Sequence, residues 1–386
     1  MTISAPNPSV ARAPHRPLAQ GAALRLLPEA CIALRCGAAA CRACQGVCPV
    51  QALAVNGDGP RLVADCLPCG RCAAACPSGA LQVDGFIGVP LPAGSGPVEV
   101  ECSRAPVALA PRAIRVPCLG GVTPAGLLRW WLAAGGAGLT LVNRGGCQDC
   151  SLGGQAFAAQ GAMDQASAWL GACGVEPARQ PRSRRATGAL RPLPEVARDA
   201  ARDRRPLSRR GFLRRVTTEV GQAVPVAAAP AGPRALLHRE PCPLPAREEL
   251  LDALGEVAAS QGSVLPRGVL PGLAVDATRC TDHGLCASAC PTGALRRFED
   301  DGRSELRFET TRCVSCRRCE QACPEHALQW GDAGPAAAST LRSTALRSCI
   351  ECGAEFAPRG AGALCIRCAT GASLARSMFG TRIAEA

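Results

Sequence analysis

The chain contains no tyrosine and no lysine, and it has few large aromatic side chains. Its 386 residues include four Trp and seven Phe. Large apolar surface is therefore scarce, and a small module with few apolar side chains needs another source of folding free energy. We expect bonds between cysteine and metal ions to supply much of it, so that metal-free modules fold poorly.

Several other features are missing. No apolar run reaches the ~18 residues that a membrane-spanning helix needs, and the first thirty residues, with four Pro before position 20, lack a signal-peptide core. There is no P-loop, no GxGxxG between a strand and a helix, and no CxxxCxxC triplet of radical enzymes. These absences favour a cytoplasmic electron-transfer protein or an oxidoreductase subunit over a self-contained enzyme.

Cysteine, in contrast, is abundant. Most of the 26 cysteines stand in CxxC runs, without the loop-closing spacing of a disulfide scaffold. Reduced thiolates bound to metals fit this spacing better than disulfides do.

The densest run extends from Cys66 to Pro77 and reads CxxCxxCxxxCP. Three thiolates at this spacing can surround one iron-sulfur cube while the fourth reaches a neighbouring cube. The ending CPxxAL occurs four times, beginning at Cys48, Cys76, Cys290 and Cys323. Four copies in two pairs predict two modules with two clusters each.

This pairing resembles bacterial two-cluster ferredoxins, in which the fourth cysteine of each motif ligates the other cluster. The resemblance implies two α+β modules, over residues 29–90 and 272–332. In the first module it implies one [4Fe-4S] cluster on Cys66, Cys69, Cys72 and Cys48, and another on Cys41, Cys44, Cys76 and either Cys36 or Cys31. We prefer Cys36 because its shorter loop costs less closure entropy.

The second module has one altered motif. Crossed ligation assigns one [4Fe-4S] cluster to Cys313, Cys316, Cys319 and Cys290. The other motif offers Cys280, Cys286 and Cys323, with His283 where a cysteine is expected. We predict a [3Fe-4S] cluster here; the alternatives are that His283 ligates a fourth iron or is a surface side chain. The modules together thus hold three to four [4Fe-4S] clusters.

Residues 97–178 show a different pattern, which predicts a small α/β domain. Short β-rich runs at 98–101, 114–116 and 139–142 alternate with expected helices at 124–134 and 155–170. Cysteines follow each expected strand: Cys102, Cys118, and then Cys147 with Cys150. Since the carboxyl ends of parallel strands share one edge, these four thiols are expected to meet there.

The middle segment also resembles the delta subunit of methyl-viologen-reducing hydrogenases, through Val116–Val122, Gly138–Val142, Gly146–Cys147 and Gly174–Pro177. That family accepts electrons through a [2Fe-2S] cluster and passes them towards heterodisulfide reductase. The resemblance implies a [2Fe-2S] cluster on Cys102, Cys118, Cys147 and Cys150. The alternative is a flavodoxin-like domain with incidental cysteines.

The remaining segments are a mobile arm at 1–28, an Arg/Pro-rich linker with a short helix at 179–245, and a helix with a connector at 246–271. Between 179 and 215 thirteen Arg face three acidic residues. Phe212 is the single aromatic residue among them, so there is no aromatic interleaving to stack bases and nucleic acid is not an expected partner. Ser208–Arg214 matches a twin-arginine export motif, yet it lies far from the N-terminus, and a capped helix is the simpler interpretation.

Near the C-terminus, Cys349 with Cys352 and Cys365 with Cys368 predict a zinc ribbon over 345–372. The sequence thus predicts two ferredoxin-like modules flanking a flavodoxin-like α/β domain, plus the ribbon. Such a polyferredoxin would relay electrons to or from a hydrogenase, formate dehydrogenase or heterodisulfide-reductase-like complex. The alternative is a redox-responsive binding or assembly protein that uses clusters and zinc as a scaffold.

Overall fold

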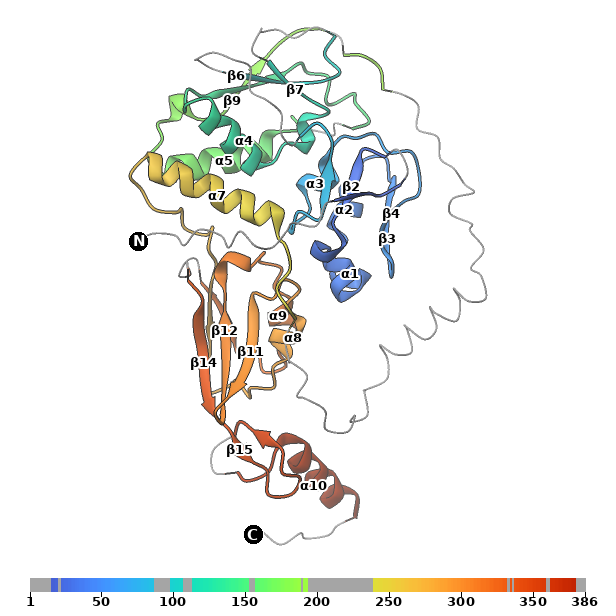
Figure 1. Cartoon of the computed structure of the whole chain (residues 1–386). Helices are drawn as coiled ribbons and strands as arrows, with labels where there is room; N and C mark the ends of the chain where they lie inside the picture. Colours follow the sequence, from blue (N-terminus) through green and yellow to red (C-terminus); the bar gives the residue numbers. More distant parts are fainter. Residues whose placement is uncertain are drawn as a thin grey trace. The chain divides into compact units, whose positions relative to one another are not determined.

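The computed structural model of the chain describes residues 15–19, 22–86, 98–106, 113–152, 157–188, 190–193, 239–331, 334, 337–358 and 362–379. Contacts between residues divide the chain into two compact units (Figure 1). Unit 1 comprises Met1–Arg234 with Pro243–Pro266, and unit 2 comprises Ala235–Cys242 with Arg267–Ala386. Within the described residues, no helix is long and apolar enough to span a membrane.

Unit 1 begins with the N-terminal module (residues 15–86), which consists of small antiparallel sheets and short helical turns. Its strands form a sheet in the order β1-β2-β5 and a hairpin of β3 with β4: β1 (Arg16–Pro17), β2 (Leu24–Leu26), β5 (Leu81–Val83), β3 (Leu53–Asn56) and β4 (Gly59–Leu62). Its helical turns are η1 (Pro28–Ala30), α1 (Ile32–Cys36), η2 (Ala38–Ala40), α2 (Ala43–Gly46) and α3 (Arg71–Ala74).

The start of this module corrects one expectation. Residues 22–28 belong to the module rather than to a mobile arm, because β2 pairs with β5 and the N–H of Leu27 donates to the carbonyl of Ala80. Leu24 is completely buried between these elements. The first 14 residues of the expected arm lie outside the described residues.

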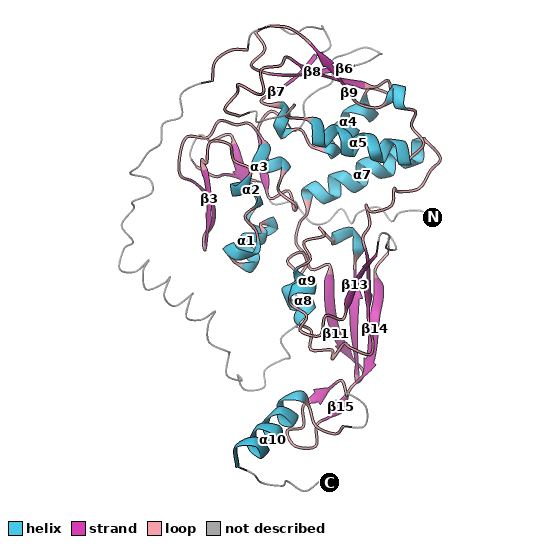
Figure 2. Ribbon diagram, turned by 180° about the vertical axis from the view of Figure 1, so that it is seen from behind, coloured by secondary structure: helices cyan, strands magenta, loops and turns pink. Residues whose placement is uncertain are grey.

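The middle domain (residues 98–188) contains a four-stranded parallel sheet in the order β7-β6-β8-β9. The strands are β6 (Val98–Cys102), β7 (Ala113–Val116), β8 (Leu139–Asn143) and β9 (Arg182–Arg185). Between them lie η3 (Leu119–Gly121), α4 (Pro124–Ala133), α5 (Gln160–Ala172) and η4 (Pro177–Arg179). Figures 1 and 2 show α4 and α5 on the same side of this sheet.

β9 is the element that the sequence did not predict. It lies in the segment expected to be a linker, so the domain does not end at residue 178. All four residues of β9, Arg-Ser-Arg-Arg, are exposed at the edge of the sheet, and the strand therefore shows no apolar alternation. Backbone groups pair β9 with β8, and this pairing needs no apolar side chains. Charged side chains are common on edge strands, where they discourage pairing with another chain. The Ser208–Arg214 motif lies outside the described residues.

α7 (Pro245–Ser260) covers the residues 247–259 that the apolar periodicity predicts to be helical. It belongs to unit 1 and packs against α4. Arg129 of α4 donates to the carboxylate of Glu256 at 2.5 Å, while Leu254 and Val257 of α7 are fully buried. The middle domain thus has an apolar core of its own, centred on buried side chains such as Trp131.

In unit 2, the C-terminal module (residues 272–345) has one three-stranded sheet in the order β11-β12-β14 and a separate pair, β10 with β13. The strands are β10 (Gly272–Val275), β11 (Leu295–Asp300), β12 (Arg303–Phe308), β13 (Leu328–Gly331) and β14 (Ser339–Ala345). The helical turns are α8 (Leu285–Ala289), η6 (Thr310–Arg312) and α9 (Arg318–Gln321). β14 extends the module beyond the expected boundary at residue 332.

The tail of unit 2 contains a short antiparallel pair and one helix. These are β15 (Arg347–Ser348), β16 (Glu355–Phe356) and α10 (Ile366–Phe379). The turn after β15 and the N-terminus of α10 carry the four cysteines expected to bind zinc.

Candidate iron-sulfur and metal sites

The four CPxxAL segments form the same turn, and this turn places the cysteine after each short helix. The fourth residue of every segment has a left-handed backbone: Gln51 (φ 52°), Gly79 (φ 72°), Gly293 (φ 69°) and His326 (φ 48°). The alanine that follows is buried in all four copies. In two copies the N–H of this alanine donates to the cysteine sulfur, Ala52 to Cys48 at 3.2 Å and Ala327 to Cys323 at 3.4 Å. Such bonds stabilise a thiolate, which is the form that binds metal.

In the N-terminal module, site 1 is a cavity lined by four cysteines. These are Cys31, Cys41, Cys44 and Cys76. Burial, together with the nearby Cys76, Cys41 and Cys31, raises the pKa of the Cys44 thiol to about 12. Four thiols gathered in one cavity resist ionisation unless a cation lies among them, so the donor set fits an iron-sulfur cluster.

Site 1 corrects the preference for Cys36. That residue does not line the cavity; Cys31 does, and Cys31 is buried whereas Cys36 is partly exposed. The closure-entropy argument assumed a flexible loop between Cys31 and Cys41. Most of the intervening residues instead form α1 and η2, so the structure spans the longer gap with helical turns.

Site 2 lies in the same module and contains the four thiols that crossed ligation predicts. These are Cys48, Cys66, Cys69 and Cys72. Burial raises the pKa of Cys66 to about 11, with further contributions from Cys69 and Cys48. Cys48 therefore lies with the second motif, just as Cys76 lies with the first. This exchange is what makes the two sites mutually dependent.

The C-terminal module repeats the exchange at site 4. Burial raises the pKa of Cys319, and the nearby thiols that raise it further include Cys290, the fourth cysteine of the other motif, together with Cys313 and Cys316. Cys290, Cys313 and Cys319 are all buried within the same core. The thiols of site 4 are thus Cys290, Cys313, Cys316 and Cys319.

Site 5 in the same module has three thiols, from Cys280, Cys286 and Cys323. Burial, together with Cys280 and Cys323, raises the pKa of Cys286 to about 12. His283 is near, and its ring, the Cys323 sulfur and a Glu325 oxygen have ligand atoms within 4.8 Å of one another.

Both ring nitrogens of His283 already have partners. Nδ1 accepts from the N–H of Leu285 at 3.0 Å, so Nε2 carries the proton and donates to the Glu325 carboxylate at 2.7 Å. Thr281 donates to the other oxygen of Glu325 at 2.7 Å. Burial acts to raise the pKa of the Glu325 carboxyl, but the hydrogen bonds from Thr281 and His283 outweigh burial and lower this pKa. An iron bound to His283 would have to displace one of these bonds.

In the middle domain, the cysteines at the carboxyl ends of β6, β7 and β8 line one pocket, site 3. They are Cys102, Cys118, Cys147 and Cys150. Burial, together with the neighbouring Cys102, raises the pKa of Cys118 to about 11. At the pocket wall, the guanidinium of Arg104 donates to the Cys150 sulfur at 2.8 Å.

The strand order explains why the thiols meet at this point. β7 lies on one side of β6 and β8 lies on the other, so the chain crosses over β6 on its way from β7 to β8. The connections that leave β6 and β8 therefore diverge, and a crevice opens between the two strand ends. A buried ion pair, Arg144 with Glu101 at 3.1 Å, joins these ends beside the thiols.

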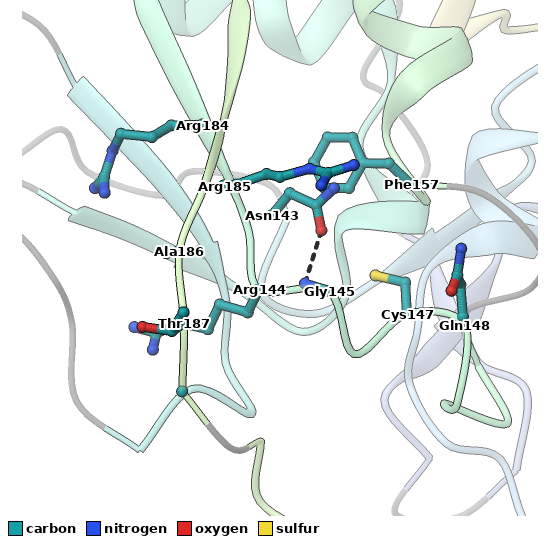
Figure 3. A pocket seen from close by; sticks show the side chains of 11 residues that line it. Asn143, Arg144, Gly145, Cys147, Gln148, Phe157, Arg184, Arg185, Ala186 and Thr187 are labelled. Carbon is teal, nitrogen blue, oxygen red and sulfur yellow. Dashed lines mark hydrogen bonds between the residues drawn. The ribbon is translucent and has the colours of Figure 1, made fainter.

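A second, larger pocket adjoins site 3 at the ends of β8 and β9. Figure 3 shows Cys147 on one side of it and Arg184 on the other, with Arg185 and Phe157 between them. Asn143 accepts from the N–H of Gly145 at 2.9 Å and so shapes the loop that carries Cys147. The thiols of site 3 thus lie near an open, positively charged rim.

In the tail, site 6 brings together the sulfur atoms of Cys349, Cys352, Cys365 and Cys368 within 4.8 Å of one another. The N–H of Cys365 donates to the Cys349 sulfur at 3.3 Å, and this backbone hydrogen bond lowers the pKa of Cys349 to about 6. Four thiols from two CxxC turns fit a tetrahedral metal ion.

Two buried cysteines lie outside these sites. Cys173 ends α5, and Cys242 is close to the carbonyl of Pro291. Sequence reasoning missed the polar partners of the thiols, namely Arg71, Arg104 and Glu325. Of these three residues, only Glu325 could have been found from the sequence, because it follows Cys323 by two residues. Arg71 and Arg104 contact segments that are distant in sequence.

One comparison with known families bears on this geometry. Residues 279–327 match the family described as the 4Fe-4S dicluster domain, and the matched range contains every thiol of sites 4 and 5. This segment is therefore of the ferredoxin type, and its chemistry is iron-sulfur electron transfer. A comparison with curated proteins gave no match.

Proposed function

We propose that the chain is a polyferredoxin that relays electrons to or from an oxidoreductase such as a hydrogenase, a formate dehydrogenase or a heterodisulfide-reductase-like complex. Sites 1, 2 and 4 hold [4Fe-4S] clusters, site 5 a [3Fe-4S] cluster, site 3 a [2Fe-2S] cluster and site 6 zinc. The observation that carries the proposal is the exchange of the fourth cysteine in both modules, because it accounts for the placement of Cys48, Cys76 and Cys290.

The clusters supply reversible one-electron transfer when bound. The residues of the chain hold the thiolates, keep water from them and adjust their charge. The parallel strand order of the middle domain supports a flavodoxin-like arrangement, and the pocket shared by Cys102, Cys118, Cys147 and Cys150 supports one small cluster at the sheet edge. Electron exchange then requires only the approach of a redox partner.

The test is anaerobic purification followed by iron, sulfide and zinc analysis and spin-resonance spectroscopy. We expect four irons for each of sites 1, 2 and 4, three for site 5 and two for site 3, with one zinc. Cys118→Ser should remove the two-iron signal and leave the others unchanged. A fully iron-loaded protein that cannot be reduced reversibly by a dehydrogenase or hydrogenase would contradict the proposed relay.

The second candidate is a redox-responsive assembly protein, and the tail favours it. Three large apolar side chains around site 6 are well exposed: Ile350, Ile366 and Leu374. Exposed apolar groups on a metal-held scaffold suit protein docking. Tight binding of a partner protein through these side chains or, in a salt-sensitive way, through the Arg-rich segment, together with slow redox turnover, would support this candidate, whereas rapid reversible reduction supports the relay.

A further inference from the structure

We propose that sites 2 and 3 form a direct electron path inside unit 1, through a dry contact between the Cys69–Arg71 turn and the Cys118–Gly121 turn. The inference rests on the proposed function, since it assumes a cluster at each site. It adds that site 2, rather than site 1, is the neighbour of site 3 in the relay.

The contact is a small buried cluster of residues from both sites. Leu67 and Cys69 of the N-terminal module pack with Cys118 and Leu152 of the middle domain, and each is at most 8% exposed. Cys150 packs against the same cluster. Ligands of two separate sites therefore share one apolar interior, from which close packing excludes water.

The two turns can approach this closely because residue 121 is glycine and lies against Gly70. A Cβ atom on Gly121 would lie 2.5 Å from the carbonyl oxygen of Cys69 and 2.8 Å from the Cα of Gly70. Both are backbone atoms, so no side chain can move aside. The separation of the two turns is thus set by the absence of a side chain at residue 121.

Arg71 of the N-terminal module stabilises this contact. It stands between Cys69 and Cys72 in the site 2 motif, and its Nε donates to the carbonyl of Leu152 at 2.8 Å. Leu152 follows Cys150 of site 3 by two residues. The guanidinium also lies against Gly120, where a Cβ would be 2.8 Å from Nε. One cationic side chain is therefore shared by the loops of both sites.

The charge of Arg71 acts on both sites. Its guanidinium stands in the loop between two site 2 thiols and is hydrogen-bonded to the loop that carries Cys150 of site 3. A positive charge that favours the anionic ligand at both sites also favours the reduced state of both clusters. Arg71 is a positioning residue, since it ligates neither cluster.

The step itself is a single-electron exchange. A reduced cluster at site 2 loses one electron and the cluster at site 3 gains it, with no bond made or broken and no proton required. Site 1 adjoins site 2 elsewhere, because its Cys44 packs against the apolar cluster that contains Cys72, and no thiol of site 1 belongs to the buried cluster that joins sites 2 and 3. The order in unit 1 is therefore site 1, site 2, site 3.

The test uses full-length protein, prepared anaerobically, and follows the spin relaxation of the two-iron signal by spin-resonance spectroscopy. Paramagnetic neighbours shorten relaxation times when they are close. We expect the two-iron signal to broaden when site 2 is reduced and to become narrow in Cys69→Ser, which removes the site 2 cluster.

Gly121→Ala tests the contact while leaving all ligands in place. The added methyl group should push the turns apart, weaken the broadening and slow electron arrival at site 3 at unchanged iron content. Gly161→Ala is the matched control, because Gly161 lies in α5 with nothing within 4 Å of its Cβ position. If Gly121→Ala does not fold, Arg71→Gln takes its place, with Arg71→Lys as the conservative variant that should partly restore the coupling.

A readout that does not need activity is hydrogen exchange. Gly121→Ala should raise amide exchange at 66–72 and 118–122, and Gly161→Ala should not. A two-iron signal that is present but indifferent to Cys69→Ser overturns the path and leaves the proposed function intact. If the full chain holds no two-iron cluster, the site 3 assignment fails first and the path fails with it.

Discussion

The two cluster modules share one scaffold, and each departs from the usual ferredoxin motif in a different way. The N-terminal module keeps four thiols at each site but widens one gap, from Cys31 to Cys41, and fills it with helical turns. The C-terminal module keeps the usual gaps but replaces one thiol by His283. The first change alters how the chain reaches the cluster, and the second alters how many thiolates the cluster receives. With the cluster types proposed above, the insertion leaves the cluster at site 1 unchanged, whereas the ligand substitution changes the cluster at site 5.

The largest expected effect separates both modules from the middle domain. Removing iron with a chelator should unfold residues 22–86 and 272–331, because cysteines form part of the small apolar core of each module. The middle domain should persist, since Trp131 and its leucine neighbours form a core without metal. Hydrogen exchange of iron-free protein measures this difference, and native-like protection in either module would contradict it.

The next effect tests the widened gap. Cys31→Ser should remove the site 1 cluster and also perturb site 2, because Cys76 and Cys48 tie the two sites together. Cys36→Ser is the matched control and should leave both signals intact. Iron analysis and spin-resonance spectroscopy distinguish the two outcomes. If Cys36→Ser abolished a cluster while Cys31→Ser did not, the lining thiols of site 1 would be wrongly assigned.

The substituted ligand gives the third prediction. His283→Cys should add one iron per chain and replace an oxidised three-iron signal by a four-iron signal, because a fourth thiolate then holds the labile iron. His283→Ala is the control and should keep the three-iron signal. Loss of a four-iron signal in His283→Ala would show that the imidazole ligates iron despite its bonds to Glu325 and Leu285.

Most thiols could be assigned from spacing, because covalent separation limits which cysteines can reach one cluster. The strands of the middle domain could also be predicted, apart from β9, whose exposed arginines carry no apolar period. Cys31 and the residues before it were misjudged because pairing of β2 with β5 and the helical turns of α1 depend on distant contacts. The contact of Arg71 with Leu152 spans 81 positions, and no local pattern could have indicated it.

The smallest expected effect concerns the left-handed turn that both modules share. At Gly293, an added Cβ would lie 2.8 Å from the carbonyl oxygen of Arg239 and 2.9 Å from the nitrogen of Pro241. Gly293→Ala should therefore lower stability by about 2 kcal/mol, through left-handed strain plus the clash. His326 has the same backbone conformation in the partner turn without being glycine.

His326→Gly is the matched comparison, and it should change stability by less than about 1 kcal/mol, because relief of left-handed strain is offset by the greater entropy of the unfolded chain. The temperature at which cluster absorbance is lost measures both variants. A gain in His326→Gly as large as the loss in Gly293→Ala would mean that the cost arises from the backbone conformation alone. A loss confined to Gly293→Ala would show that packing of the 239–241 segment, rather than the turn itself, selects glycine at this position.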